Sequence, residues 1–97
     1  KGGVLALSRQ MAIDGAKDHI RVNAMIVGAV DTAMLRSQAE SEGKSFEDLG
    51  FRLSPREIGH VGQPHEVAQA ALFLASDESS FVTGAPLIVD GGLLASL

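Results

Sequence analysis

The sequence has no cysteine, tryptophan or tyrosine, and four phenylalanines are its only aromatic residues. Without cysteine, the chain cannot form a disulfide framework, a thiolate metal site or a cysteine nucleophile, and no feature indicates an oxidising compartment. The three histidines, His19, His60 and His65, are irregularly spaced, so we interpret them as surface or loop residues. We therefore expect a cytoplasmic protein and predict no metal site.

Long apolar runs and basic runs are also absent. The longest apolar stretch, residues 24–30, includes Gly28 and is far shorter than the ~20 residues that span a bilayer. The formal net charge of -4 comes from 12 acidic and 8 basic residues, with no basic cluster of the kind that binds nucleic acid. We therefore expect neither a membrane nor a nucleic acid as a partner.

The chain of 97 residues begins with a lysine, inside a segment that already has helical periodicity. Its length allows one domain at most. We therefore expect residues 1–97 to be a single partial domain of a longer protein.

Hydrophobic periodicity predicts two helices. Over residues 2–16, Val4, Leu7 and Met11 recur at helical spacing with Leu5 and Ala12 beside them. Gly15 is the expected stop because glycine tolerates the left-handed conformation. A second helix is expected from Gln63 to about Ala75, where Pro64 suits the first turn and Glu66 complements the N-terminal dipole.

Two segments predict strands. Residues 20–27 are rich in β-branched side chains and predict a parallel strand buried on both faces, and residues 86–89 predict the last strand. The alternation of helix and strand indicates an α/β fold, the C-terminal part of a doubly wound, Rossmann-like parallel sheet. Residues 33–62 follow the C-terminal end of the first strand, where open α/β sheets bind ligands, and we interpret them as a substrate lid.

Several groups of residues match one known family in order and spacing. They are Lys1–Val4, Ile20–Ala24, Gly28–Thr32, Gly62–Ala68, Phe73–Asp77, Phe81–Gly84 and Val89–Gly92. Together they resemble the second half of the short-chain dehydrogenase/reductase family, and only about residues 35–57 are unaligned. The resemblance implies an oxidoreductase that uses NAD or NADP to interconvert a secondary alcohol and a ketone. It also implies a small-molecule substrate and a homotetramer or homodimer.

The resemblance also implies roles for individual residues. Lys1 matches the lysine of the Tyr-x-x-x-Lys motif, where its ammonium lowers the tyrosine pKa by ~1–3 units and holds the nicotinamide ribose. Gly28 permits close approach to the flat nicotinamide ring, the Val30 backbone binds its carboxamide, and Thr32 adds a hydroxyl.

Other interpretations of these residues remain open. From the residues alone, Lys1 is a solvated lysine, and residues 28–32 form a strand-to-loop turn in which Asp31 or Thr32 caps a helix. We interpret Asn23 as a structural contact to a neighbouring loop, and residues 90–92 as a structural glycine turn.

The sequence departs from the family at two positions. Val27 and Ala33 stand where the family commonly has proline, and this difference is expected to loosen the loop between them. The family's serine and tyrosine belong upstream of Lys1, as does the residue that distinguishes NAD from NADP, so residues 1–97 alone are expected to be inactive. The alternatives are a non-catalytic binding or oligomerisation module and a separately made partner chain.

Overall fold

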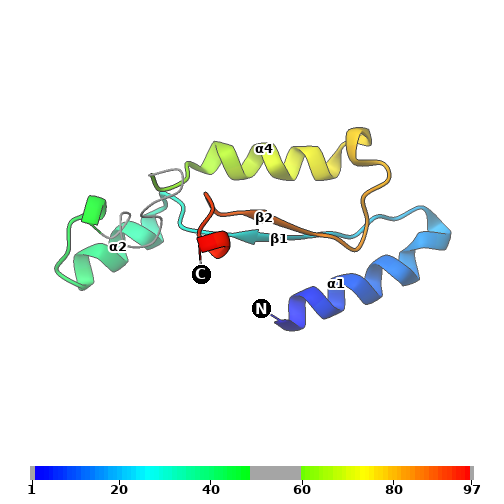
Figure 1. Ribbon diagram of the computed structural model, residues 1–97, viewed down its shortest axis with the longest axis horizontal. Coiled ribbons are helices and arrows are strands. Elements are labelled where there is room, and N and C mark those ends of the chain that lie inside the picture. The colour runs from blue at the N-terminus through cyan, green and yellow to red at the C-terminus, as the bar shows by residue number, and fades with distance from the viewer. Residues whose placement is uncertain (1, 49–59, 97) are drawn as a thin grey trace. The chain divides into compact units, whose positions relative to one another are not determined.

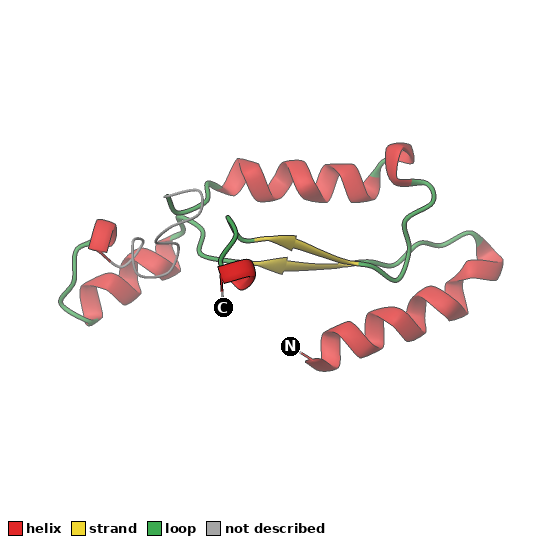
Figure 2. Ribbon diagram, viewed as in Figure 1, coloured by secondary structure: helices red, strands yellow, loops and turns green. Residues whose placement is uncertain are grey.

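The computed structural model describes residues 2–48 and 60–96 (Figure 1). Its α-helices are α1 (Gly2–Gly15), α2 (Ala33–Ser41) and α4 (Pro64–Ala75), and its strands are β1 (Ala24–Val27) and β2 (Pro86–Val89). Short 3₁₀ turns follow at Ala16–Asp18, Asp77–Ser79 and Leu94–Ser96. The mixture of helices and strands predicted from the sequence is therefore present (Figure 2).

Strands β1 and β2 pair directly in a two-stranded sheet, and their arrows point the same way in Figure 2. Backbone bonds run from Gly84 N to Val22 O (2.7 Å), from Ala24 N to Ala85 O (3.0 Å) and from Gly28 N to Val89 O (3.0 Å). The two segments predicted to be strands are therefore neighbours in one parallel sheet, as expected of a Rossmann-like fold.

By its contacts the chain divides into two compact units. The first comprises Lys1–Ile26 and Gln69–Ile88, and the second comprises Val27–Ala68 and Val89–Leu97.

Helix α1 in the first unit ends at Gly15, as predicted, but for a different reason. Gly15 has right-handed helical angles, and the left-handed residue is His19, with a φ of 58° after the 3₁₀ turn. A Cβ on Gly15 would lie 3.1 Å from the Cβ of Ile20. The glycine therefore allows the chain to fold back closely, and the expectation of a left-handed Gly15 is wrong.

Only part of the apolar set predicted for α1 turns inward. Ala12 is buried, and Leu5 and Ser8 on the same side are half-buried. Val4, Leu7 and Met11 are exposed instead. The helix therefore presents an apolar stripe, Val4–Leu7–Met11, that no described residue covers.

Strand β1 is shorter than the segment 20–27 that the sequence predicted. Residues 21–23 form hydrogen bonds with the connector before β2 instead of continuing the strand. The Asn23 side chain donates to Val82 O (3.0 Å) and accepts from Ala85 N (3.0 Å). This confirms the structural interpretation of Asn23. The expectation of burial on both faces is wrong among the described residues, because Ala24 is buried whereas Val27 is exposed.

Helices α2 and α4 in the second unit have well-defined starts. Thr32 Oγ1 accepts a hydrogen bond from Leu35 N (3.2 Å), and the Glu66 carboxylate accepts one from Gln63 N (2.7 Å). Side-chain acceptors of this kind satisfy the free N–H groups of a first helical turn. The end of α4 at Ala75 agrees with the sequence, and none of the described helices is long and apolar enough to cross a membrane.

A glycine turn follows β2, as expected. Gly91 and Gly92 have φ angles of 65° and 94°, which favour glycine. The Asp90 carboxylate accepts from Gly92 N (2.8 Å) and from Leu94 N (2.9 Å). The structural interpretation of residues 90–92 is therefore confirmed.

Candidate cofactor and substrate site

The candidate site lies in residues 28–32, directly after β1. Gly28, Val30 and Thr32 are all in the second unit, whereas Lys1 lies outside the described residues. Phe51 and Leu53 of the expected lid also lie outside the described residues. The described part of the lid contains α2 and a further helical turn at residues 46–48, so the segment does contain short helical pieces.

Gly28 lies against the turn that follows β2. A Cβ on Gly28 would be 2.8 Å from the Cβ and 2.9 Å from the Cα of Asp90. Contacts this short with the Cα and Cβ of Asp90, neither of which is the flexible end of a side chain, leave no room for a side chain on Gly28. Gly28 is therefore required by the packing of the two strand ends, whatever else it approaches.

Val30 lies in an isolated parallel bridge with Gly62. The two bonds of the bridge join Gly62 N to Ala29 O (2.9 Å) and Asp31 N to Gly62 O (2.8 Å). Both bonds involve Ala29 and Asp31, the residues on either side of Val30. The N–H and C=O of Val30 itself make no hydrogen bond within residues 2–48 and 60–96. A backbone donor and acceptor are therefore available to a ligand at this residue.

Thr32 is the N-cap of α2. Its backbone is extended, with φ of -131° and ψ of 163°, and its hydroxyl accepts from Leu35 N. The capping role that the residues alone predicted is therefore present. A threonine hydroxyl also donates one hydrogen bond, so the cap leaves its O–H available to a second partner.

Asp31 and Arg36 form an ion pair that the sequence analysis missed. Arg36 Nε lies 2.7 Å from Asp31 Oδ1 and Arg36 Nη2 lies 2.9 Å from Asp31 Oδ2, which is a two-point fork. The hydrogen bond from Arg36 lowers the pKa of Asp31 and raises that of Arg36. The guanidinium also lies over the Phe46 ring, 4.1 Å from its centre.

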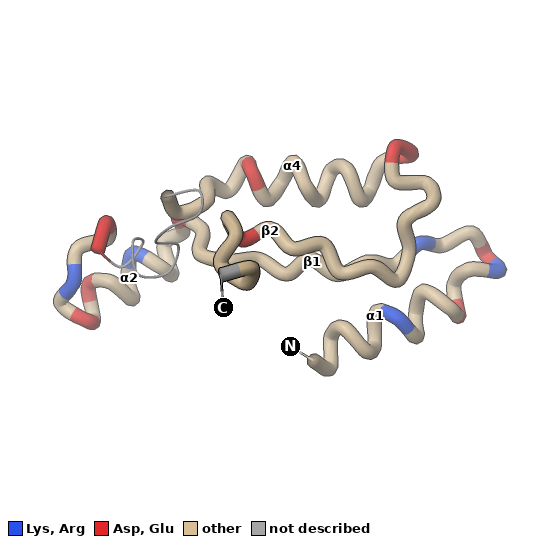
Figure 3. The backbone as a smooth tube through the Cα atoms, viewed as in Figure 1, with Lys and Arg blue, Asp and Glu red and all other residues tan. Residues whose placement is uncertain are grey.

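Other cations are scattered along the described chain. Figure 3 shows them at separate positions on α1, in the turn after it, before β1 and around α2. Lys44 pairs loosely with Glu42, at 3.7 Å. The Asp31–Arg36 fork is therefore a tighter and more directional contact at the start of the same segment.

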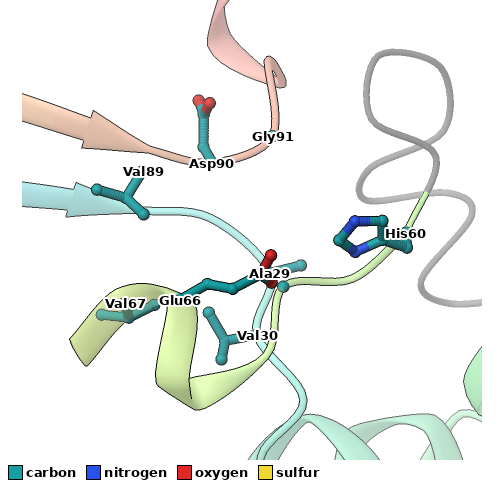
Figure 4. A pocket seen from close by; sticks show the side chains of 9 residues that line it. Ala29, Val30, His60, Glu66, Val67, Val89, Asp90 and Gly91 are labelled. Carbon is teal, nitrogen blue, oxygen red and sulfur yellow. The ribbon is translucent and has the colours of Figure 1, made fainter. Parts of the chain in front are cut away.

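A pocket of about 110 Å³ lies beside Val30 (Figure 4). Its lining residues are Ala29, Val30, His60, Gly62, Glu66, Val67, Val89, Asp90 and Gly91. Figure 4 shows Glu66 extending toward the loop that carries Ala29, whereas the Asp90 carboxylate points away. Both carboxylates already accept backbone N–H groups. In the described ranges, no three His, Cys, Asp or Glu residues are grouped so as to hold a metal ion.

These features define part of an α/β sheet of the Rossmann type: the paired parallel strands, the ligand-accessible loop after β1 and the glycine turn after β2. The family model described as Enoyl-(Acyl carrier protein) reductase matches residues 1–94. The chain belongs to the short-chain dehydrogenase/reductase family, and it corresponds to the C-terminal part of that fold.

Known proteins resemble the chain over nearly its whole length. It is 44% identical over 95 residues to 2,5-dichloro-2,5-cyclohexadiene-1,4-diol dehydrogenase of Sphingobium indicum, covering 98% of this chain and 37% of that protein. The ligand-free structure of Thermoplasma acidophilum aldohexose dehydrogenase matches with a TM-score of 0.87 at 37% identity, covering 97% of this chain and 38% of that one.

A third similar protein has a nucleotide bound. The NADPH-bound short-chain oxidoreductase of Pseudomonas aeruginosa PAO1, described as having an atypical catalytic centre, matches with a TM-score of 0.82 at 36% identity. This match covers 95% of the chain and 36% of the Pseudomonas protein. The chain spans only 36 to 41% of the length of the curated relatives that it matches.

Proposed function

We propose that the protein containing this chain is an NAD- or NADP-dependent oxidoreductase that interconverts a secondary alcohol and a ketone. The observation that carries the proposal is the loop after β1, where the Val30 N–H and C=O are free of hydrogen bonds to described residues. A primary carboxamide has one acceptor and two donors, so it complements such a backbone pair. The NADPH in the Pseudomonas structure supports a nucleotide of this class.

Three described residues would hold the nicotinamide end of the cofactor. Val30 would bind the carboxamide through its backbone, Thr32 would donate its hydroxyl, and Gly28 would keep the loop close to the end of β2. When bound, the nicotinamide supplies the hydride acceptor or donor. The loop fixes which face of the ring meets the substrate, so the transfer would be stereospecific.

Lys1 would act on a tyrosine four residues upstream, one helical turn away. A cation at that distance favours the phenolate and lowers the tyrosine pKa toward neutrality. The phenolate then accepts the alcohol proton in oxidation, and the phenol returns it in reduction. Because that tyrosine and the carbonyl-polarising serine are not in this sequence, residues 1–97 alone would have no activity.

The remaining parts of the proposal concern the whole protein. Residues 1–97 would form the C-terminal portion of one nucleotide-binding domain, with residues 33–62 as the substrate lid. The protein would be cytoplasmic and a homotetramer or homodimer. The exposed apolar stripe Val4–Leu7–Met11 on α1 supports an oligomer, because a contiguous apolar surface can pack against a second copy of the protein.

The test is a comparison of three proteins that contain the chain: wild type, Lys1→Met and the control Lys17→Met, which changes a lysine in the turn after α1. We expect reduction of NAD⁺ or NADP⁺ by a panel of secondary alcohols. Lys1→Met should lower kcat/KM at least ~100-fold, the lower end of a general-acid/base contribution, whereas Lys17→Met should have no effect. Cofactor binding without turnover on any alcohol would support a non-catalytic module instead.

A further inference from the structure

The strongest unassigned feature is the cluster Asp31–Arg36–Phe46, in which one side chain joins three parts of the second unit. Arg36 belongs to α2, its fork binds Asp31 in the loop after β1, and its guanidinium covers Phe46 in the turn beyond α2. Arg36 N also donates to Thr32 O (3.0 Å). We propose that Arg36 is a positioning residue that holds residues 28–32 in the conformation that receives the nicotinamide carboxamide.

Asp31 is the point through which Arg36 would act. It directly follows Val30, and its side chain is only 21% exposed, whereas that of Arg36 is 58% exposed. Asp31 is also held by its N–H, which donates to Gly62 O (2.8 Å). These contacts hold Asp31 after Val30, and the bond from Gly62 N to Ala29 O (2.9 Å) holds the residue before it, so together they fix the direction of the free Val30 N–H.

The fork matters because proline is missing on both sides of this loop. Val27 and Ala33 leave two φ angles unlocked that a proline would fix, so the free loop has more conformations to lose when it binds a ligand. A bidentate Arg–carboxylate contact restricts both partners, and the Phe46 ring restricts the guanidinium. Arg36 therefore replaces part of the rigidity that the two prolines would give.

This inference rests on the proposed function, since it needs a nicotinamide cofactor at Val30. Its effect should fall on cofactor binding, because Arg36 points to Asp31 and not to any reacting group. Loss of an exposed fork and a cation–π contact should weaken the binding of NADH or NADPH about three- to tenfold. The kcat at saturating cofactor should change less than the KM for cofactor.

The experiment is a fluorescence titration of the full-length protein with NADH and with NADPH, which reports binding without turnover. The proteins are wild type, Arg36→Ala, Arg36→Lys and the control Lys17→Ala, which removes a cation outside the second unit. We expect Arg36→Ala to raise the Kd, Arg36→Lys to raise it by less because lysine keeps the charge but not the fork, and Lys17→Ala to leave it unchanged.

The outcomes separate the two proposals. If wild type binds neither nucleotide, the proposed function fails and this inference fails with it. If wild type binds and folded Arg36→Ala binds equally tightly, only the positioning role is overturned. If Arg36→Ala does not fold, as judged by circular dichroism, then Arg36→Lys decides, and an unchanged Kd for that variant overturns the proposal.

Discussion

At the scale of single residues, Gly28 is a position where a methyl group has no room. Gly28→Ala would bring a Cβ to 2.9 Å from the Asp90 Cα, which the flexible end of a side chain cannot relieve. Overpacking of this kind costs about 1–3 kcal/mol, so we expect a matching fall in the free energy of unfolding in urea. Gly3→Ala is the matched control, because a Cβ there meets nothing within 4 Å and alanine favours a helix by up to about 1 kcal/mol. Equal effects of the two substitutions would contradict this account.

Asp31 gives a pH dependence whose sign follows from its lowered pKa. The hydrogen bond from Arg36 lowers the pKa of the folded carboxyl below its ordinary 3.8. Its contribution to stability is therefore present above about pH 4 and is lost as the pH falls through the folded pKa. We expect Asp31→Asn to be less stable than wild type at pH 6 and equal to it in strong acid.

Urea midpoints at several pH values would measure this difference. Because the Arg36 side of the pair is exposed to solvent, the difference should be small and should shrink further in high salt. Asp18→Asn is the control, since the Asp18 side chain makes no ion pair or hydrogen bond with any described residue. A wild-type advantage that persisted in strong acid would show that the carboxylate charge is not its source.

At the scale of elements, Arg21 and Ser79 connect the approach to β1 with the connector before β2. Arg21 Nη1 donates to Ser79 Oγ (2.8 Å) and to Val82 O (3.2 Å), and Nη2 donates to Ser76 O (3.0 Å). Ser79 is fully buried and also bonds to Leu74 O (2.9 Å). A single arginine therefore satisfies the carbonyls at which α4 ends and the connector turns.

Ser79→Ala should destabilise this network. The substitution leaves Arg21 and the Leu74 carbonyl short of a partner, at a cost of about 1–3 kcal/mol. Ser8→Ala is the matched control, because the hydrogen bond from the half-buried Ser8 to Val4 O is itself exposed, and its loss should change stability by less than about 0.5 kcal/mol. Thermal unfolding of both variants would measure the difference, and equal losses would mean that the buried network contributes little.

Thr32 has two roles that substitution can separate. Thr32→Ala removes the cap of α2, which costs about 1 kcal/mol, and it also removes the hydroxyl proposed to meet the cofactor. Thr32→Ser keeps both, and Thr32→Asn keeps a capping acceptor but changes the donor. We expect Asn to restore stability, measured by denaturation, without restoring cofactor affinity, measured by titration. If Thr32→Asn restored both stability and cofactor affinity, the Thr32 hydroxyl would have no specific role in the proposed site.

The sequence predicted the bounds of helices and strands well where hydrophobic periodicity determines them, and less well where contacts with distant residues determine them. The end of α4 and both ends of the last strand follow from apolar spacing and flanking glycine or proline. Strand β1 begins four residues later than predicted, because the polar groups around Arg21 and Asn23 bind the connector. Periodicity did not show which apolar residues of α1 would be buried: Ala12 is, because it packs where Gly84 leaves space, with 3.5 Å between the Ala12 Cβ and a Cβ built on Gly84.

The sequence predicted which residues form the candidate site, but it did not predict all the side-chain contacts around them. The register of residues 28–32 against the strand was readable, and the cap at Thr32 was among the expected alternatives. The Asp31–Arg36 fork was not, because a spacing of five residues across a helix start matches neither helical pairing distance. The nearness of Phe46 depends on how the chain turns after α2, and no local pattern encodes that turn.

At the scale of the whole molecule, the described chain covers little of its apolar surface. The buried hydrophobic residues within residues 2–48 and 60–96 are all alanines, at positions 12, 24 and 39. Large side chains are exposed instead, with Phe81 at 101%, Met34 at 81% and Ile13 at 70%. Three buried alanines and larger apolar side chains that are only partly buried do not offset an ordering cost of about 1–2 kcal/mol per residue, so the fold needs further apolar partners.

We therefore expect residues 1–97, expressed alone, to form aggregates of mixed size and to bind the dye ANS, whereas the full-length protein should sediment as one defined species and bind little dye at the same concentration. Sedimentation velocity and dye fluorescence would measure this, with urea unfolding as the third reading. A chain of 97 residues that stayed monomeric, bound no dye and unfolded in one sharp transition would contradict the expectation. Such a result would mean that the exposed apolar side chains pack together within one copy, and the oligomer interface proposed for the Val4–Leu7–Met11 stripe would lose its support.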